Sequence, residues 1–417
     1  MALPRFLRAV QRVRHAACAA VATLCAVALS PAPAAAQAPV VAAAPVPAPW
    51  AVAMERELAR VPKQENARLG VYVHDLATGQ RLSFHGDEPW YLASSVKVPI
   101  AIAVLRAVER GDFTLETALT LRASDYVDGA GATNRQPVGA SLKVRWLLEQ
   151  MIIYSDNTAS DMLIGLVGIR EVNAVKQSLV PEGLNRITTL ADVRRHAYGQ
   201  LTPQADHLSG TDFLLLKQQR SEADVKSALA RLLHLQAADL RSLSLAQAYD
   251  AYYAQGLNSG RLDAYADLLA QLVDGKALSA RHTSYLLGVM GRVKTGTQRI
   301  KAGLPPGARF AHKTGTQRAR TCDSGLVTMP RAAQERRVIV VACTSGEPST
   351  ARSDRMLRHV GVALCQSGLL SPDGKPHETT CPTVIPPGSA HPVAPAVVGG
   401  PGPAGGSDAH GDLRDEP

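Results

Sequence analysis

Ser94 and Lys97 stand three residues apart, at the start of an apolar run over residues 98–105. On a helix this spacing puts both side chains on one face. Serine is a poor nucleophile until a neighbouring base takes its proton, and a lysine in a desolvated site loses its own proton near neutral pH. The pair predicts an activated serine, although alone it also fits a capped core helix with a solvated lysine.

Ser155-Asp156-Asn157 is the second group that suits such a nucleophile. It follows an apolar helical pattern over residues 144–153 and precedes another that begins at Thr158. A serine hydroxyl at a junction of this kind can relay protons, and an asparagine amide can hold a substrate amide or position the lysine.

Lys313-Thr314-Gly315-Thr316 is the third group, and the strand-like run 325–329 follows it. On a strand edge, the lysine and threonine side chains would meet a substrate carboxylate. The glycine would let a substrate backbone come close.

In this order, the three groups resemble the S-x-x-K, S-D-N and K-T-G motifs of class A β-lactamases and penicillin-binding proteins. The resemblance covers about residues 50–370. It implies a two-lobed α/β fold in which the terminal helices cover an antiparallel sheet. The middle of the chain would form an all-helical lobe, with the site in the cleft between the lobes.

The resemblance also implies covalent acyl transfer. Ser94 would attack a strained lactam or a peptide carbonyl, with Lys97 as the favoured base. Ser155 would pass a proton to the leaving nitrogen while Asn157 positions the substrate. The remaining roles implied are an oxyanion hole from the backbone N–H groups of Ser94 and Thr316, and a substrate carboxylate near Lys313 and Thr314. No metal or organic cofactor is expected.

The deacylation step is where the chain departs from the family pattern. In class A β-lactamases a loop glutamate activates the water that hydrolyses the acyl-enzyme. The corresponding loop-like segment here, residues 186–198, contains no glutamate. Glu182, Asp192 and His196 remain as alternatives, as does the absence of any dedicated loop base. Three functional interpretations therefore stay open: a β-lactamase, a DD-peptidase or penicillin-binding protein, and a trap or sensor that reacts once.

The tetrapeptide of the third group occurs twice, because Lys294-Thr295-Gly296-Thr297 repeats it. The first copy follows a helical pattern and leads into a Gly/Pro-containing loop, whereas the second is followed by strand-like sequence. The second copy is therefore predicted to be the functional one.

Residues 1–36 are typical of an export signal, with a basic start, an apolar run over residues 16–29 and an Ala34-Ala35-Ala36 cleavage site. The formal net charge of the 417-residue chain is +9, and removing the four arginines of this segment leaves 9 − 4 = +5. This mild charge, without a basic run, argues against nucleic-acid binding. We expect an exported protein, periplasmic or secreted, without a membrane span. Its partner would be a β-lactam or a peptidoglycan peptide, and its oligomeric state is open with a monomer favoured.

Four cysteines lie beyond this signal. Cys322 and Cys343 would face each other if two predicted strands pair around residues 330–337, so a cross-strand disulfide is expected there. Cys365 and Cys381 would then join the last helix to the tail. The alternative is four reduced, buried thiols.

The expected organisation has five parts. They are a signal peptide over residues 1–36, a Pro/Ala-rich linker over 37–49, a serine hydrolase domain over 50–370, a helical insertion within it over about 199–245, and a disordered Pro/Gly-rich tail over 371–417.

Overall fold

The computed structural model describes residues 47–330, 335–371 and 381–382. The expected signal peptide, nearly all of the linker and most of the tail lie outside these residues. Within the described part of the chain, no helix combines the length and the apolar character needed to cross a bilayer.

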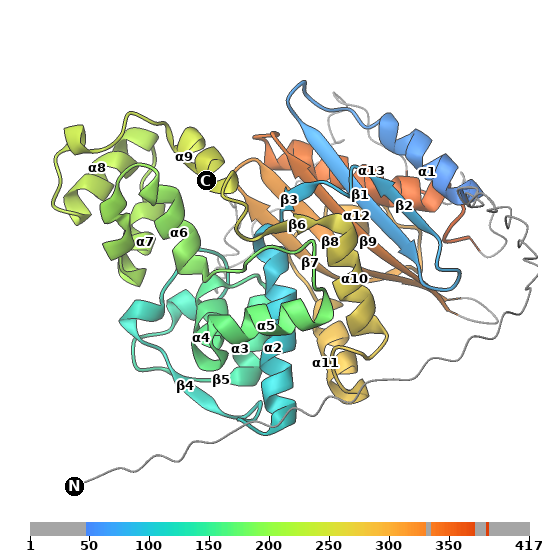
Figure 1. Ribbon diagram of the computed structural model, residues 1–417, viewed down its shortest axis with the longest axis horizontal. Coiled ribbons are helices and arrows are strands. Elements are labelled where there is room, and N and C mark those ends of the chain that lie inside the picture. Colours follow the sequence, from blue (N-terminus) through green and yellow to red (C-terminus); the bar gives the residue numbers. More distant parts are fainter. Residues whose placement is uncertain (1–46, 331–334, 372–380, 383–417) are drawn as a thin grey trace, which may run out of the picture. The chain divides into compact units, whose positions relative to one another are not determined.

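A five-stranded sheet in the order β2-β1-β9-β8-β7 forms one half of the fold, and every neighbouring pair is antiparallel (Figure 1). The strands are β1 (Arg68–Asp75), β2 (Arg81–Phe84), β7 (Arg309–Gln317), β8 (Arg320–Met329) and β9 (Arg336–Ser345). Strands β1 and β2 form an antiparallel hairpin. Strand β7, which carries the second tetrapeptide, forms an edge of the sheet.

Helices cover both faces of the sheet, because successive residues of a strand point to opposite faces and nearly all residues of β1 and β9 are buried. Val71 and Val340 pack into a core shared with α1 (Pro49–Ala59), α12 (Ile300–Gly303) and α13 (Thr350–Gln366). Tyr72 and Val341 point the other way, into the core shared with the helical half. The terminal helices thus lie on one face, as expected from the resemblance.

The helical half is built from the middle of the chain (Figure 1). Its helices are α2 (Lys97–Arg110), α3 (Val144–Ile153), α4 (Asn157–Val167), α5 (Ile169–Leu179), α6 (Leu190–Gly199), α7 (Gly210–Lys217), α8 (Glu222–Leu232), α9 (Leu245–Tyr253), α10 (Leu262–Val273) and α11 (Ala280–Met290). Two short ladders join β3 (Pro89–Tyr91) to β6 (Ser259–Arg261), and β4 (Ala118–Thr120) to β5 (Ser141–Lys143). The two-lobed α/β architecture is confirmed.

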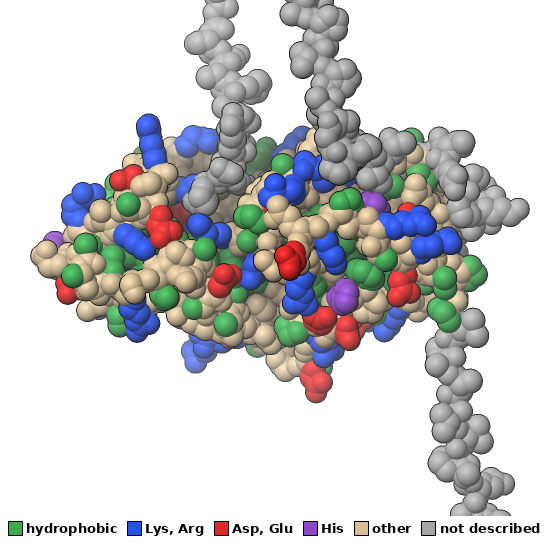
Figure 2. All heavy atoms as spheres, turned by 90° about the horizontal axis from the view of Figure 1, so that it is seen from above, with side chains coloured by type: hydrophobic (Ala, Val, Ile, Leu, Met, Phe, Trp, Pro, Cys, Tyr) green, Lys and Arg blue, Asp and Glu red, His purple; other side chains and the backbone are tan. Residues whose placement is uncertain are grey.

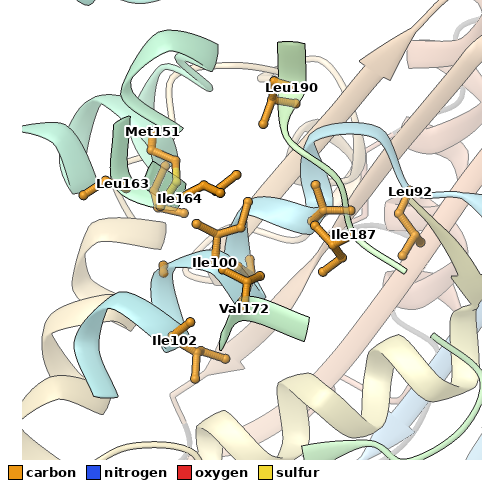
Figure 3. Close-up of a cluster of buried hydrophobic side chains, with 14 of the residues drawn as sticks. Leu92, Ile100, Ile102, Met151, Leu163, Ile164, Val172, Ile187 and Leu190 are labelled. Atoms are coloured by element: carbon orange, nitrogen blue, oxygen red, sulfur yellow. The ribbon is translucent and has the colours of Figure 1, made fainter. Parts of the chain in front are cut away.

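Helix α2 is the central element of this half. Figure 3 shows Ile100 and Ile102 of α2 among side chains of other elements, including Ile164 and Val172. The helix ends at Gly111, which adopts a left-handed φ of 83° that glycine tolerates without strain. A helix packed on all sides has little freedom to shift, so Lys97 at its first position is held firmly.

Both expected disulfides are present. Cys322 and Cys343 are directly paired in the β8–β9 register, with Cα atoms 4.1 Å apart. Cys365 of α13 is joined to Cys381. Figure 2 shows acidic and basic side chains interspersed over one face of the molecule.

One local expectation is wrong. Residues 186–198 are loop-like only as far as Thr189, because α6 begins at Leu190. The Thr189 hydroxyl accepts a hydrogen bond from the Asp192 N–H and so caps the helix. Val193 and Ala197 are buried one turn apart on the face that packs on the protein. The cap and this apolar spacing outweigh the polar composition that suggested a loop.

Candidate active site

Ser94 lies in a 3₁₀ turn, η1 (Ala93–Val96), that runs directly into α2. The expected helix therefore begins at Lys97, and Ser94 belongs to the turn before it. Ser94 is partly exposed, whereas Lys97 is fully buried. Strand β7 passes so close that a Cβ at Gly315 would lie 2.5 Å from the Leu92 carbonyl oxygen and 3.3 Å from the Ser94 nitrogen. Only glycine fits there, which explains this residue of the motif.

The Lys97 ammonium group bridges α2 and the junction between α3 and α4. Its Nζ donates to Asn157 Oδ1 at 2.7 Å, to Ser155 Oγ at 3.2 Å and to the Ser155 carbonyl. Lys97 Nζ is therefore aimed at the second motif, as the sequence predicts.

Ser155 joins α3 to α4 with a left-handed φ of 62°. Asp156, buried beneath it, caps α4 by accepting the Ala159 N–H at 2.9 Å and also accepts the Thr133 N–H at 2.9 Å. Non-glycine residues rarely adopt a positive φ, so the surrounding structure must hold this conformation. The anchored Asp156 side chain supplies that hold and keeps the Ser155 hydroxyl facing the site.

Lys313 brings the sheet into the same cluster. Its side chain is buried, and Nζ donates to Ser155 Oγ at 2.9 Å and to the carbonyl of the next residue, Thr314, at 2.9 Å. Ser155 Oγ is thus contacted by two lysine side chains, one from each half of the fold. The second tetrapeptide is the one whose lysine joins the cluster.

The first copy of the tetrapeptide lies beside the second. The hydroxyls of Thr295 and Thr314 share a hydrogen bond of 2.5 Å, and the Lys294 N–H donates to the Ile153 carbonyl. The Lys294 side chain itself is exposed. The copies are therefore neighbours in space, although only one lysine points into the site.

Arg299 is a site residue that the sequence reasoning missed. Its guanidinium is buried and donates to the carbonyls of Gly315 and Cys322, both at 3.1 Å, and to Thr316 Oγ1 at 2.8 Å. Asp354 of α13 balances its charge at 2.7 Å. Four contacts from one side chain fix the end of β7 that borders Ser94. No local motif marks this arginine, because its partners lie 16 to 55 residues away in the sequence.

The three alternatives for a loop base are placed as follows. Glu182 is exposed just after α5, Asp192 pairs with Arg195 at 2.9 Å, and His196 stacks on Tyr252 with ring centroids 6.2 Å apart. None of these contacts involves Ser94 or Lys97.

Arg194 of α6 instead supports the site from outside. It forms two hydrogen bonds with the Asp128 carboxylate, at 2.6 and 2.8 Å. The Asp128 carbonyl in turn accepts from Asn157 Nδ2 at 2.6 Å. Asn157 is therefore fixed on both sides, by Asp128 and by Lys97. Among the described residues, no cluster of three or more histidine, cysteine or acidic side chains is arranged to hold a metal ion.

Comparison with known proteins agrees with this geometry. A family model described as "Beta-lactamase enzyme family" matches residues 53–367. The chain belongs to this family.

Similar curated proteins are named as beta-lactamases. Beta-lactamase L2 of Stenotrophomonas maltophilia is 35% identical over 122 residues, which cover 29% of this chain and 40% of that protein. The chain thus spans about two fifths of that relative's length. A beta-lactamase of Streptomyces lavendulae is 26% identical over 317 residues, covering 75% of this chain and 86% of the relative.

Solved structures share the fold. A structure titled "Last common ancestor of Gram-negative bacteria (GNCA4) beta-lactamase class A" is 25% identical, covers 75% of this chain and 98% of its own, and gives a TM-score of 0.54. A structure titled "Structure of PBP-A" is 24% identical, with 75% and 94% covered and a TM-score of 0.55. The fold is therefore common to the β-lactamase of class A and to PBP-A.

Proposed function

We propose that this chain is an exported serine hydrolase that opens β-lactam rings through an ester of Ser94. The observation that carries the proposal is the convergence of Lys97 and Lys313 on Ser155 Oγ, at 3.2 and 2.9 Å, beside the turn that holds Ser94. Membership of the beta-lactamase family supports it. Two lysine side chains around one hydroxyl, next to a partly exposed serine, suit a reaction in which a proton is relayed from nucleophile to leaving group.

Acylation follows from these contacts. Lys97, as the neutral amine, takes the Ser94 hydroxyl proton while Ser94 Oγ bonds to the lactam carbonyl carbon. The tetrahedral intermediate then collapses, the carbon–nitrogen bond breaks, and Ser155 gives its proton to the nitrogen. Lys97, now an ammonium, returns a proton to Ser155 Oγ through the contact at 3.2 Å. Every proton is accounted for, and Ser94 carries an ester.

Substrate binding is assigned to the edge of β7. Lys313 and Thr314 would meet the substrate carboxylate, while the backbone N–H groups of Thr316 and Ser94 would stabilise the oxyanion. Arg299 would act indirectly, by holding the Gly315 carbonyl and Thr316 Oγ1 in place. Asn157 would position the amide side of the substrate.

A DD-peptidase, or a penicillin binder that releases its product slowly, is the second candidate. The start of α6 favours it, because Asp192 is paired with Arg195 and Arg194 is paired with Asp128. An arginine stays protonated at any working pH and cannot serve as a base. Acylation uses none of these side chains as its base, so efficient acylation with slow hydrolysis is the behaviour that this candidate predicts.

Export is part of the proposal and depends on residues 1–36. Their basic start, apolar run and Ala-rich end are those of a signal peptide. The two disulfides suit the oxidising compartment to which such a signal would direct the chain.

Intact-protein mass spectrometry with a penicillin, and separately with a peptidoglycan stem peptide, tests the proposal. We expect a penicillin adduct that Ser94→Ala abolishes. Ser95→Ala is the matched control, since the neighbouring Ser95 hydroxyl is buried and accepts or donates no hydrogen bond within the described structure. A brief adduct with product release supports the β-lactamase, and a persistent one supports the second candidate. Labelling that survives Ser94→Ala refutes the nucleophile.

A further inference from the structure

Asp161 is a carboxylate that acylation does not use. It lies on α4, and its two oxygens accept the first backbone N–H groups of α6: Oδ1 from Leu190 at 2.7 Å and Oδ2 from Ala191 at 2.8 Å. The Leu190 side chain turns away into the hydrophobic cluster of Figure 3. At the start of α6, the side chain of Leu190 is therefore apolar, and the nearby carboxylate is that of Asp161 on α4.

The Asp161 carboxylate lies between two helices that contribute to the site, α4 and α6. Asp161 follows Asn157 by four residues on the same helix, so the two side chains lie on one face of α4, and Asn157 touches Lys97. Helix α6, which Asp161 holds, packs through Val193 into the same cluster as Ala93, the residue before Ser94. Asp161 is partly exposed as a residue, while the surrounding protein desolvates its carboxylate.

The electrostatic surroundings suit a base at neutral pH. Burial raises the pKa of Asp161 to about 7. The hydrogen bonds from the backbone N–H groups of Leu190 and Ala191 lower the pKa, but burial has the larger effect. Two charged side chains also act on it: Asp192 of α6 raises its pKa further, and Lys97 of α2 lowers it. A general base works best when its pKa lies near the operating pH.

We propose that Asp161 is the general base that activates the water for hydrolysis of the Ser94 ester. The inference rests on the proposed acyl-enzyme and supplies a base other than Asp192, the carboxylate of α6 that is paired with Arg195. A carboxylate offers about four lone-pair directions, and the two backbone bonds leave room for a water.

Hydrolysis of the ester begins with the attack of this water. Asp161 takes one proton from the water as the water oxygen bonds to the ester carbon. The tetrahedral intermediate collapses, the bond between that carbon and Ser94 Oγ breaks, and the product leaves as a carboxylic acid. The proton held by Asp161 goes to Ser94 Oγ, directly or through Lys97, which restores the serine and the carboxylate.

The test measures acylation and deacylation separately, by rapid-quench mass spectrometry with a penicillin, in the full chain across about pH 5 to about pH 9. In the wild type, deacylation should accelerate as pH rises through about 7, because only the ionised carboxylate accepts a proton. Asp161→Asn should slow deacylation by about 10² to 10⁴ and abolish this rise, leaving acylation unchanged.

Thr189→Ala is the control for a merely structural role of Asp161. It removes the other support of the α6 start, the bond from the Asp192 N–H to Thr189 Oγ1 at 3.0 Å, and keeps the carboxylate. We expect it to retain the rise of deacylation with pH. Asp161→Glu, which also keeps the charge, should retain the rise at a lower rate and serves if Asp161→Asn does not fold.

Several results would overturn the inference. A deacylation rate that does not change with pH in the wild type would do so, as would a rise that persists in Asp161→Asn. Equal losses in Asp161→Asn and Thr189→Ala would show that the carboxylate only anchors α6. If the ester forms on Ser94 and any of these results follows, the proposed function survives without its base. If no ester forms, the proposed function itself fails, and this inference falls with it.

Discussion

Replacing Lys313 by alanine separates the two tetrapeptides and tests the central cluster. The change removes a buried cation that donates to Ser155 Oγ and to the Thr314 carbonyl, both at 2.9 Å. It also removes the charge assigned to the substrate carboxylate. A hydrogen bond to a charged group contributes about 2 to 3 kcal/mol at the upper end of its range. Because each 1.36 kcal/mol is about tenfold in rate, acylation should fall about 30- to 160-fold.

The assay is the second-order rate constant of acylation by a penicillin, read from the rate of adduct formation. Lys294→Ala is the matched control, since Lys294 occupies the same place in an identical tetrapeptide but has an exposed side chain. Its acylation rate should equal that of the wild type. Thermal unfolding of both variants separates a loss of the site from a loss of the fold.

Two outcomes would refute this reasoning. If Lys294→Ala lost activity and Lys313→Ala did not, the contact of Lys313 with Ser155 would have no part in acylation. If Lys313→Ala lowered acylation only in proportion to its unfolded fraction, Lys313 would be a structural residue of the sheet.

Two further changes probe the supports of the site. Arg299→Ala should lower both the unfolding temperature and the acylation rate, because it leaves the buried Gly315 carbonyl without its donor, and an unchanged acylation rate would argue against this support. On α6, Arg194→Glu should slow acylation by placing a carboxylate against that of Asp128. Val193→Glu should speed deacylation, because Val193 belongs to the same buried cluster as Ala93, the residue before Ser94. Time-resolved mass spectrometry checks both, and faster deacylation in Arg194→Glu alone would contradict the orientation of α6.

The parts of the site that sequence could predict are those written into short segments. The spacing of Ser94 and Lys97 is local, and the structure preserves it even though Ser94 lies in a turn rather than in the helix. The pairing of Cys322 with Cys343 followed from counting outward from one turn, since an antiparallel register is set by its connection. Such predictions need no knowledge of distant contacts.

The parts that sequence could not predict depend on contacts between distant segments. Arg299 resembles any surface arginine until β7 and Asp354 close around it. Asp161 looks like an ordinary polar residue of a helix until the start of α6 meets it 29 residues later. The helix α6 itself was missed because its polar composition hides an apolar face of only a few residues.

The segment from α6 to α9 shows how the site tolerates a long excursion of the chain. Residues 184–188 run beside 258–260, so residues 189–257 leave and return at one point. Asn258 closes that point: its side chain accepts the Thr188 N–H at 3.0 Å and donates to Thr188 Oγ1 at 2.8 Å and to the Tyr252 hydroxyl at 3.0 Å. Its carbonyl accepts the N–H of Leu92, two residues before Ser94.

The pairing of residues 184–188 with residues 258–260 limits how much conformational entropy a longer excursion costs. The entropy of closing a loop grows only with the logarithm of its length, so extra helices add little once the ends are joined. The site requires that the paired residues 184–188 and 258–260, and the start of α6, stay fixed. Asn258 secures the first and Asp161 the second, through side-chain hydrogen bonds that do not depend on α7 or α8. The excursion can therefore vary in length while the residues beside Ser94 keep their positions.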